Sequence, residues 1–273
     1  MWTWKLLVGL QGFLNSPDNI HMSKENPKEI IILGMHRSGT SMLSGVLNRL
    51  GIDMGDDQVG RQQSNPLGHF EDGELLSLNE YILSQAGGSW DNPPPAAQIQ
   101  NQAAKLNDRI QKIIQDKRLA NQDQHWGWKD PRTSLTINLY LPYLRNPYII
   151  WSQRDPVSIS NSLWIRNEIS PEEADELTEY YQKQIKDFFR QHPELPVLEI
   201  SYQDMIDQPG YWIHKIVGFL NLDVGEVQLT KAADFVLPSE KIQRERKILW
   251  WKSKLSLPVR ALRKFGVIKK KHP

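Results

Sequence analysis

The order of apolar and polar positions along the chain predicts strands that alternate with helices. Residues 29–34 (EIIILG) and 148–152 (YIIWS) are short, almost wholly apolar runs, typical of strands buried on both faces of a parallel sheet. Residues 125–129 and 196–206 predict two further strands. Helical spacing is clearest in residues 42–51, where apolar side chains recur every three or four positions before a closing glycine.

Prolines mark where several helices should begin. We expect helices to start at Pro156, Pro171 and Pro209, because proline fits the first turn of a helix. Other helices are expected over residues 74–85 and 135–144, and a Gln-rich helix should follow the prolines at 93–95 and end near Lys117. Together these elements predict a three-layer α/β/α fold with a mainly parallel central sheet.

The composition fits a globular protein with one large domain. The 273 residues are 39% hydrophobic and 24% charged, which is ordinary for a soluble chain. There is no cysteine, which excludes disulfides and thiolate metal sites and favours the reducing cytoplasm. We predict an N-terminal extension over residues 1–28, a main domain over residues 29–240 and a C-terminal tail over residues 241–273. The apolar N-terminal run has no cleavage site after it, so a secretory signal is not expected.

Charge is distributed unevenly, although the net charge of the chain is only +1. Residues 241–273 carry a net charge of +11 and the rest of the chain −10, and Trp250, Trp251 and Phe265 lie among the cations of the tail. Such a tail could contact the inner face of an anionic membrane or hold a polyanionic acceptor. A solvated terminal helix is the simpler interpretation. No nucleic-acid recognition motif accompanies the tail, so nucleic acid is not an expected partner.

The stretch GMHRSGTSML follows the first predicted strand and has most features of a phosphate-binding loop. Gly34, Gly39 and Ser41 occupy the positions of the pattern GxxxxGK[ST], but Thr40 stands where nucleotide-binding loops carry lysine. The backbone N–H groups and the helix N-terminus can still hold an anion. Arg37 supplies a cation within the loop instead of at its end. This arrangement suits an anion smaller than a triphosphate chain.

A bound magnesium ion is not expected at this loop. Magnesium-dependent phosphoryl transfer uses a carboxylate at the end of a neighbouring strand, and Asp155 is the obvious one. Asp155 fits equally well as the cap of the helix that begins at Pro156. We therefore predict a metal-independent site.

The loop resembles the 5′-phosphosulfate loop of sulfotransferases that use 3′-phosphoadenosine 5′-phosphosulfate (PAPS), which commonly reads RSGT or KSGT. The resemblance implies the P-loop-nucleotide-hydrolase-like fold of these enzymes and PAPS as co-substrate. It implies that the phosphosulfate is held by Arg37, Ser38, Gly39, Thr40 and Ser41. Arg37 would also stabilise charge on the sulfuryl group during transfer.

Three other segments support the resemblance. Arg154 and Ser162 are eight residues apart, like the pair that binds the 3′-phosphate of PAPS in this family. The segment GWKDPRTSL is similar to the NKDP segment of tyrosylprotein sulfotransferases, which gives Lys129 the role of stabilising the transferring group. Tyr202 matches a tyrosine beside the adenine in cytosolic sulfotransferases. Each of these residues also has a purely structural interpretation. Arg154 and Ser162 could belong to an ordinary helix start, Lys129 could be a surface lysine, and Tyr202 could be a core tyrosine on a strand.

The general base is a choice among three neighbours. No histidine follows Lys129, where cytosolic sulfotransferases have one, and the nearest acidic cluster is in NPLGHFEDGELL. Glu71 is the first candidate, since tyrosylprotein sulfotransferases supply a glutamate from this region, and His69 and Asp72 are the alternatives. These residues would also make an ordinary acidic helix start.

The sequence therefore predicts a PAPS-dependent sulfotransferase that acts on an acceptor hydroxyl. A glycan or glycolipid is the expected acceptor, and a protein tyrosine is the second choice. One alternative is a P-loop nucleotide kinase, or a nucleotide-binding module, that lost its lysine. Another is a non-catalytic, membrane-associated binding protein that uses the tail.

Overall fold

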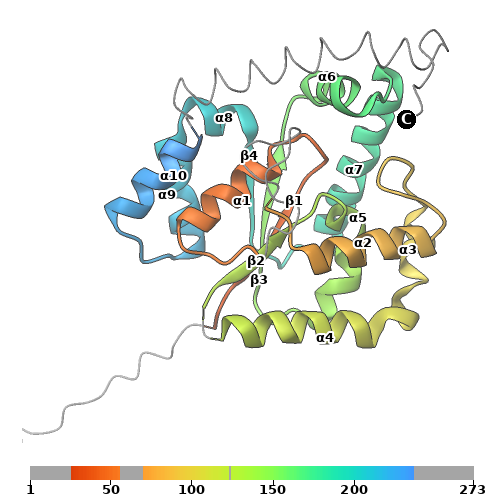
Figure 1. Cartoon of the computed structure of the whole chain (residues 1–273), viewed down its shortest axis with the longest axis horizontal. Coiled ribbons are helices and arrows are strands. Elements are labelled where there is room, and N and C mark those ends of the chain that lie inside the picture. Colours follow the sequence, from red (N-terminus) through yellow and green to blue (C-terminus); the bar gives the residue numbers. More distant parts are fainter. Residues whose placement is uncertain (1–25, 56–69, 123, 237–273) are drawn as a thin grey trace, which may run out of the picture.

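A computed structural model describes residues 26–55, 70–122 and 124–236 of the chain. Their strands form one four-stranded sheet in which all neighbours are parallel (Figure 1). The strands lie in the order β2 (Trp126–Lys129), β1 (Glu29–Leu33), β3 (Pro147–Gln153), β4 (Val197–Ser201). In the register, Ile31 of β1 lies opposite Trp128 of β2 and Ile149 of β3.

Both faces of the sheet are covered, because consecutive side chains of β1 point to opposite sides and all are buried. Ile31 and Leu33 belong to one core cluster, and Ile30 and Ile32 to the other. The first face is packed by α2 (Gly73–Gln85), α4 (Ala103–Asn121), α5 (Thr133–Tyr140) and α7 (Pro171–Gln191). The second is packed by α1 (Thr40–Arg49), α9 (Pro209–Leu220) and α10 (Glu226–Val236) (Figure 1). The predicted three-layer α/β/α fold is confirmed.

Local capping explains several helix starts. Asp155 caps α6 (Pro156–Asn167) by accepting a hydrogen bond from the Ser158 backbone N–H at 2.9 Å. Ser170 and Glu173 form a capping box at the start of α7. The capping interpretation of Asp155 is thus confirmed, and its position at the end of β3 needs no metal to explain it.

One predicted strand is too long, and two helices were not predicted. The strand expected over residues 196–206 ends at Ser201, whose hydroxyl accepts from the Asp204 backbone N–H at 3.4 Å and starts the short helix α8 (Tyr202–Asp207). Tyr202 therefore begins a helix and does not lie on a strand. The second unpredicted helix, α10, packs on α1, where the Phe235 ring lies directly against Gly45.

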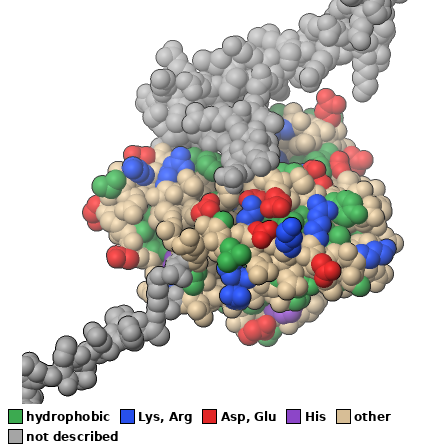
Figure 2. Space-filling view, turned by 60° about the horizontal axis from the view of Figure 1, so that its bottom comes forward, with side chains coloured by type: hydrophobic (Ala, Val, Ile, Leu, Met, Phe, Trp, Pro, Cys, Tyr) green, Lys and Arg blue, Asp and Glu red, His purple; other side chains and the backbone are tan. Residues whose placement is uncertain are grey.

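The remaining differences are at element ends. The Gln-rich helix is divided into α3 (Ala96–Gln100) and α4, and α5 is followed by a 3-10 turn, η1 (Leu141–Tyr143), in which Pro142 lies. The basic tail, all but the last residues of the N-terminal extension, and His69 lie outside the described residues. No helix of the described ranges is both long enough and apolar enough to cross a membrane. Acidic and basic side chains are mixed over the face of the molecule that carries α4 (Figure 2).

Candidate active site

The predicted site residues meet at the carboxyl edge of the sheet. Parallel strands end on the same side, so the turns after β1, β2 and β3 lie next to one another. These turns carry the loop from Gly34 to Gly39, Lys129 at the end of β2, and Arg154 directly after β3. Glu71, from the segment just before α2, contacts Lys129.

The loop has a backbone conformation that few other residues could adopt. Gly39 precedes α1 with a φ of 102°, and no side chain caps the helix, so its first N–H groups remain available to an anion. A Cβ on Gly34 would lie 2.8 Å from the Ser152 carbonyl oxygen, which leaves no room for a side chain. Arg37 has a φ of 70°, a left-handed conformation that is unusual for a non-glycine residue. Strained conformations of this kind are concentrated at functional sites.

Side chains from neighbouring elements hold the loop in place. The Ser134 hydroxyl accepts a hydrogen bond from the Gly34 backbone N–H at 2.9 Å, and the Ser152 hydroxyl donates to the Ser38 carbonyl at 2.9 Å. The Ser38 hydroxyl itself is buried and has no hydrogen-bond partner among the described residues. A buried hydroxyl left unpaired inside an anion-binding loop fits a ligand oxygen at that position. The loop therefore suits a phosphosulfate group.

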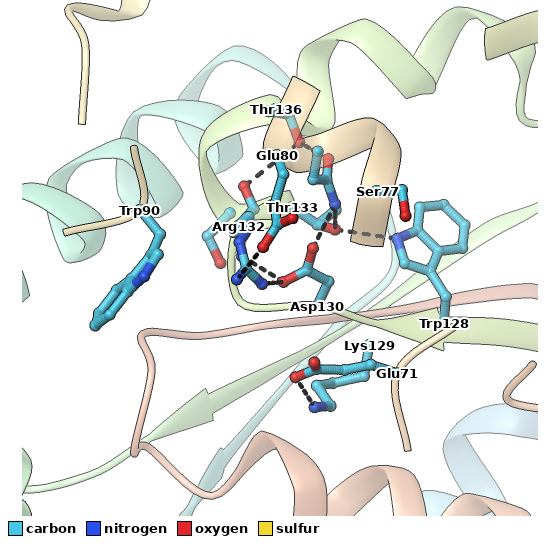
Figure 3. A network of polar contacts seen from close by, with 12 residues as sticks. Glu71, Ser77, Glu80, Trp90, Trp128, Lys129, Asp130, Arg132, Thr133 and Thr136 are labelled. Carbon is cyan, nitrogen blue, oxygen red and sulfur yellow. Dashed lines mark hydrogen bonds and ion pairs between the residues drawn. The ribbon is translucent and has the colours of Figure 1, made fainter. Parts of the chain in front are cut away.

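Lys129 lies between the loop and a carboxylate. Its side chain is 1% exposed, and its Nζ lies 2.6 Å from Glu71 Oε1 (Figure 3). The same Nζ lies 3.2 Å from the Ser41 hydroxyl at the start of α1. A buried ammonium needs such partners, because an uncompensated charge would be costly to bury. The interpretation of Lys129 as a surface lysine is therefore wrong, since the side chain is buried.

The predicted 3′-phosphate residues lie against the loop arginine. Arg37 Nε donates to the Ser162 hydroxyl at 2.9 Å, and Arg154 donates to the Arg37 carbonyl at 3.0 Å. The Arg154 guanidinium also lies 4.5 Å from the centre of the Tyr202 ring, which packs against Gly39. Arg154, Ser162 and Tyr202 are thus in direct contact with the loop or with one another.

The electrostatics of this cluster favour an anion. Burial, together with the neighbouring cations Arg166 and Arg154, lowers the pKa of Arg37 to about 10. The guanidinium is still charged at neutral pH, but part of its stabilisation by water has been lost. Because Arg154 and Arg166 both repel the Arg37 charge, a bound phosphate would relieve this repulsion.

Lys129 is followed by a buried polar network that fixes the turn after β2 (Figure 3). The Asp130 carboxylate accepts from Arg132 at 2.9 Å and from the Asn79 amide at 2.8 Å. Asn79 also bonds Thr133, Thr136 and Tyr140. Burial is the main cause that raises the pKa of Asp130, and the Arg132 charge opposes it. Asn79 was not selected from the sequence, because a single amide on an amphipathic helix carries no signal.

Asp72 has structural partners. Its carboxylate accepts from the backbone N–H groups of Glu74 and Leu75 at 3.1 Å each, so it is the N-cap of α2. Its other oxygen lies 2.6 Å from Lys117 Nζ on α4. These contacts match the helix-start interpretation for Asp72, whereas Glu71 contacts Lys129.

His36 is a site residue that was missed from the sequence. Its ring packs against Trp90 with centroids 4.2 Å apart and the planes tilted by 39°, and it lies edge-on to Tyr181 at 6.1 Å. Burial, followed by the charges of Arg132, Lys129 and Arg37, lowers its pKa well below the usual value, so the imidazole is neutral at neutral pH. One indication of its importance was visible in the sequence: His36 lies between a predicted buried strand and Arg37 of the loop.

Among the residues that the structure describes, no group of three or more acidic or histidine side chains could hold a metal ion.

Comparison with known proteins identifies the fold family. The family model described as Sulfotransferase family matches residues 27–226, most of the chain. The chain belongs to the sulfotransferase family. This family takes its sulfuryl group from PAPS, and the open helix start, the unpaired Ser38 hydroxyl and the arginine cluster fit that co-substrate.

Solved structures agree with the fold of this sulfotransferase. The sulfotransferase domain of the olefin synthase from Synechococcus PCC 7002 is 21% identical, with a TM-score of 0.52, over 76% of this chain and 78% of that one. The sulfotransferase domain from the curacin biosynthetic pathway is 18% identical, with a TM-score of 0.51, over 75% of this chain and 77% of that one. No curated protein matches the sequence.

Proposed function

We propose that the protein transfers the sulfuryl group of PAPS to a hydroxyl of a glycan or glycolipid. The observation that carries the proposal is the position of Lys129, whose ammonium lies within 3.2 Å of the loop residue Ser41 and 2.6 Å from the Glu71 carboxylate. A cation and a base therefore flank the mouth of an anion-binding loop. Sulfuryl transfer needs this combination of charge stabilisation and proton removal.

The reaction breaks the bond between sulfur and the bridging phosphate oxygen and forms a bond between sulfur and the acceptor oxygen. Arg37 and Lys129 stabilise negative charge on the sulfuryl oxygens and on the departing phosphate. Glu71 takes the proton of the acceptor hydroxyl late in the step. The products are a sulfate ester and adenosine 3′,5′-bisphosphate, and no other reactant is consumed.

The donor's other end is assigned to Arg154, Ser162 and Tyr202. Ser162 already accepts a hydrogen bond from Arg37 at 2.9 Å, so its hydroxyl must be shared with the 3′-phosphate when the donor binds. Two anionic groups then bind near the three arginines that repel one another in the free protein. Donor affinity is expected to come mainly from relief of this repulsion.

Glu71 is the proposed base because it is the carboxylate that contacts Lys129. In the donor-free protein the ion pair holds both groups, and a sulfuryl group that attracts Lys129 frees the carboxylate to accept a proton. Asp72 remains bound to Lys117 and to the start of α2. His69 lies outside the described residues.

Calorimetry with adenosine 3′,5′-bisphosphate tests the donor site. We expect binding in the presence of a chelator, and Arg37→Ala should abolish most transfer from radiolabelled PAPS, since loss of one such donor costs on the order of a hundredfold to a thousandfold. Arg190→Ala, which changes an exposed arginine at the far end of α7, is the control and should keep the parental rate. Turnover of Arg37→Ala at the parental rate would refute the assignment.

The same experiment separates the alternatives. Magnesium-dependent binding of ATP without binding of the bisphosphate would indicate a kinase-like module, and no nucleotide binding would indicate a non-catalytic protein. The acceptor is then sought by incubating labelled PAPS with a panel of glycans, glycolipids and tyrosine peptides. Membrane contact by residues 241–273 stays a prediction, tested by sedimentation with anionic vesicles.

A further inference from the structure

Two buried nitrogen atoms near Lys129 have unused hydrogen-bonding capacity. His36 Nε2 and Arg132 Nε are both closed off from solvent, and neither has a hydrogen-bond partner among the described residues. An unpaired buried polar atom costs free energy, so each such atom in a native structure requires an explanation. A polar ligand group between them would supply it.

The two atoms belong to neighbouring side chains. Burial lowers the pKa of His36, and among nearby charges the Arg132 guanidinium contributes more than Lys129 or Arg37. Tyr181 lies next to both: its ring centroid is 6.1 Å from that of His36, and the Arg132 charge opposes the rise that burial causes in its pKa. Both side chains therefore lie in the neighbourhood of Tyr181, close to the Lys129–Glu71 pair.

Their chemistry fits a hydroxyl. Arg132 Nε–H only donates, whereas a neutral imidazole protonated on Nδ1 offers Nε2 as an acceptor. One hydroxyl can donate to His36 and accept from Arg132. The nearby cations already have partners, since Arg132 pairs with Asp130 and Glu80, and Lys129 pairs with Glu71. A neutral group therefore suits this place better than a further anion.

Trp90 adds an apolar surface beside these polar atoms. Its partly buried ring packs against His36 with centroids 4.2 Å apart, and its carbonyl accepts a hydrogen bond from the Tyr181 hydroxyl at 3.0 Å. In Figure 3, Trp90 lies on the Arg132 side of the polar network, and the Lys129–Glu71 pair lies below Asp130. Ligand sites commonly combine an aromatic wall with a few fixed polar groups.

We propose that His36, Arg132 and Trp90 form a subsite for a second hydroxyl of the acceptor, separate from the hydroxyl that is sulfated at Lys129 and Glu71. The acceptor is then a polyol, such as a sugar ring, whose carbon skeleton rests on Trp90. His36 acts as a positioning residue and takes no proton in the reaction. This inference rests on the proposed sulfotransfer and names its substrate class.

Kinetics with two matched probes test the subsite. Cyclohexanol and trans-cyclohexane-1,2-diol differ by one hydroxyl, and each is offered with radiolabelled PAPS. We expect the parent to favour the diol by about tenfold or more in kcat/KM, because a site built for a hydroxyl rejects an analogue that lacks it. His36→Phe keeps the ring on Trp90 but removes Nε2, and it should erase the preference by raising KM for the diol.

The controls separate this role from others. His36→Gln, which places an amide near the Nε2 position, should restore part of the preference. His192→Phe, at another ring that packs on an aromatic neighbour with centroids 5.0 Å apart, should retain all of it. Affinity for adenosine 3′,5′-bisphosphate and hydrolysis of PAPS by water should stay at parental values in His192→Phe, and melting temperatures report folding in all three variants.

Several outcomes would overturn the subsite. The first is that the parent uses both alcohols equally, and the second is that the diol preference survives in His36→Phe. The third is that PAPS hydrolysis and both transfers fall equally in His36→Phe, which would make His36 a base or a donor ligand. If neither alcohol is sulfated, the ¹⁵N resonance of His36 Nε2 in the bisphosphate complex decides: it must shift with the diol and not with cyclohexanol. Failure of bisphosphate binding instead contradicts the proposed function itself.

Discussion

Replacing Lys129 with methionine separates its catalytic role from its structural one. Methionine keeps an unbranched side chain of similar length and removes the charge. The Lys129 side chain is 1% exposed and its partner Glu71 is 11% exposed, with 2.6 Å between Nζ and Oε1. The substitution therefore leaves a carboxylate almost buried beside an apolar side chain.

The expected cost follows from this burial. Breaking a buried ion pair by removing one partner costs about 3–5 kcal/mol in the free energy of unfolding, and because Glu71 keeps some contact with water we expect about 3 kcal/mol. The double variant Lys129→Met with Glu71→Gln removes both charges, so it should lie within about 1–2 kcal/mol of the parent. Sulfuryl transfer should fall about a hundredfold to a thousandfold in both proteins.

The assay is a double-mutant cycle of urea unfolding at neutral pH, with single-turnover transfer from labelled PAPS in the same proteins. Lys117→Met is the matched control, since Lys117 also lies 2.6 Å from a carboxylate, that of Asp72, but is 23% exposed. It should cost about 1 kcal/mol and leave the rate unchanged. Additive losses in the cycle, or parental turnover of Lys129→Met, would refute the reasoning.

Other substitutions test the remaining assignments. Asp72→Ala should lower stability by about 1 kcal/mol through loss of the α2 cap while transfer continues at the parental rate, and a collapse of rate would identify Asp72 as the base instead. Gly39→Ala should weaken binding of adenosine 3′,5′-bisphosphate in calorimetry by about tenfold, because the new Cβ meets the Tyr202 ring at 2.5 Å and φ is 102°, and parental affinity would contradict this. The pKa of His36 is lowered in the folded protein. When the pH falls below the usual pKa of histidine, His36 therefore takes up a proton in the unfolded chain but stays neutral in the native state. The parent should therefore lose stability relative to His36→Phe on acidification. A difference in melting temperature between the two proteins that stays constant from neutral to mildly acidic pH would rule this out.

Much of the fold could be predicted from the sequence because its strands are buried on both faces. A run such as EIIIL in β1 has few other stable structures, and glycine and proline mark the turns around it. The end of β4 was misjudged because its capping residue, Ser201, resembles any polar strand residue. Helix α10 was missed because its clearest feature is a tertiary contact, in which the Phe235 ring packs against Gly45 of α1.

The candidate site was predictable where chemistry is local in the chain and not where it is assembled from distant segments. The loop, Lys129 and the Arg154–Ser162 pair all stand at strand ends or at the helix that follows, so a parallel sheet brings them together. The pairing of Lys129 with Glu71 joins residues 58 positions apart and depends on the packing of α2. The stack of His36 on Trp90 depends on the course of the turn after α2, which no periodicity encodes.

The cluster of Arg37, Arg154 and Arg166 also affects how the enzyme completes its cycle. A site whose cations repel one another when empty gains from any multivalent anion, and the bisphosphate product has nearly the same anionic groups as the donor. Product departure, more than sulfur chemistry, is then expected to limit turnover. Added salt should speed that departure by screening, while inorganic phosphate or sulfate in a buffer competes for the same cations. Rates measured in different buffers are therefore comparable only at matched anion composition.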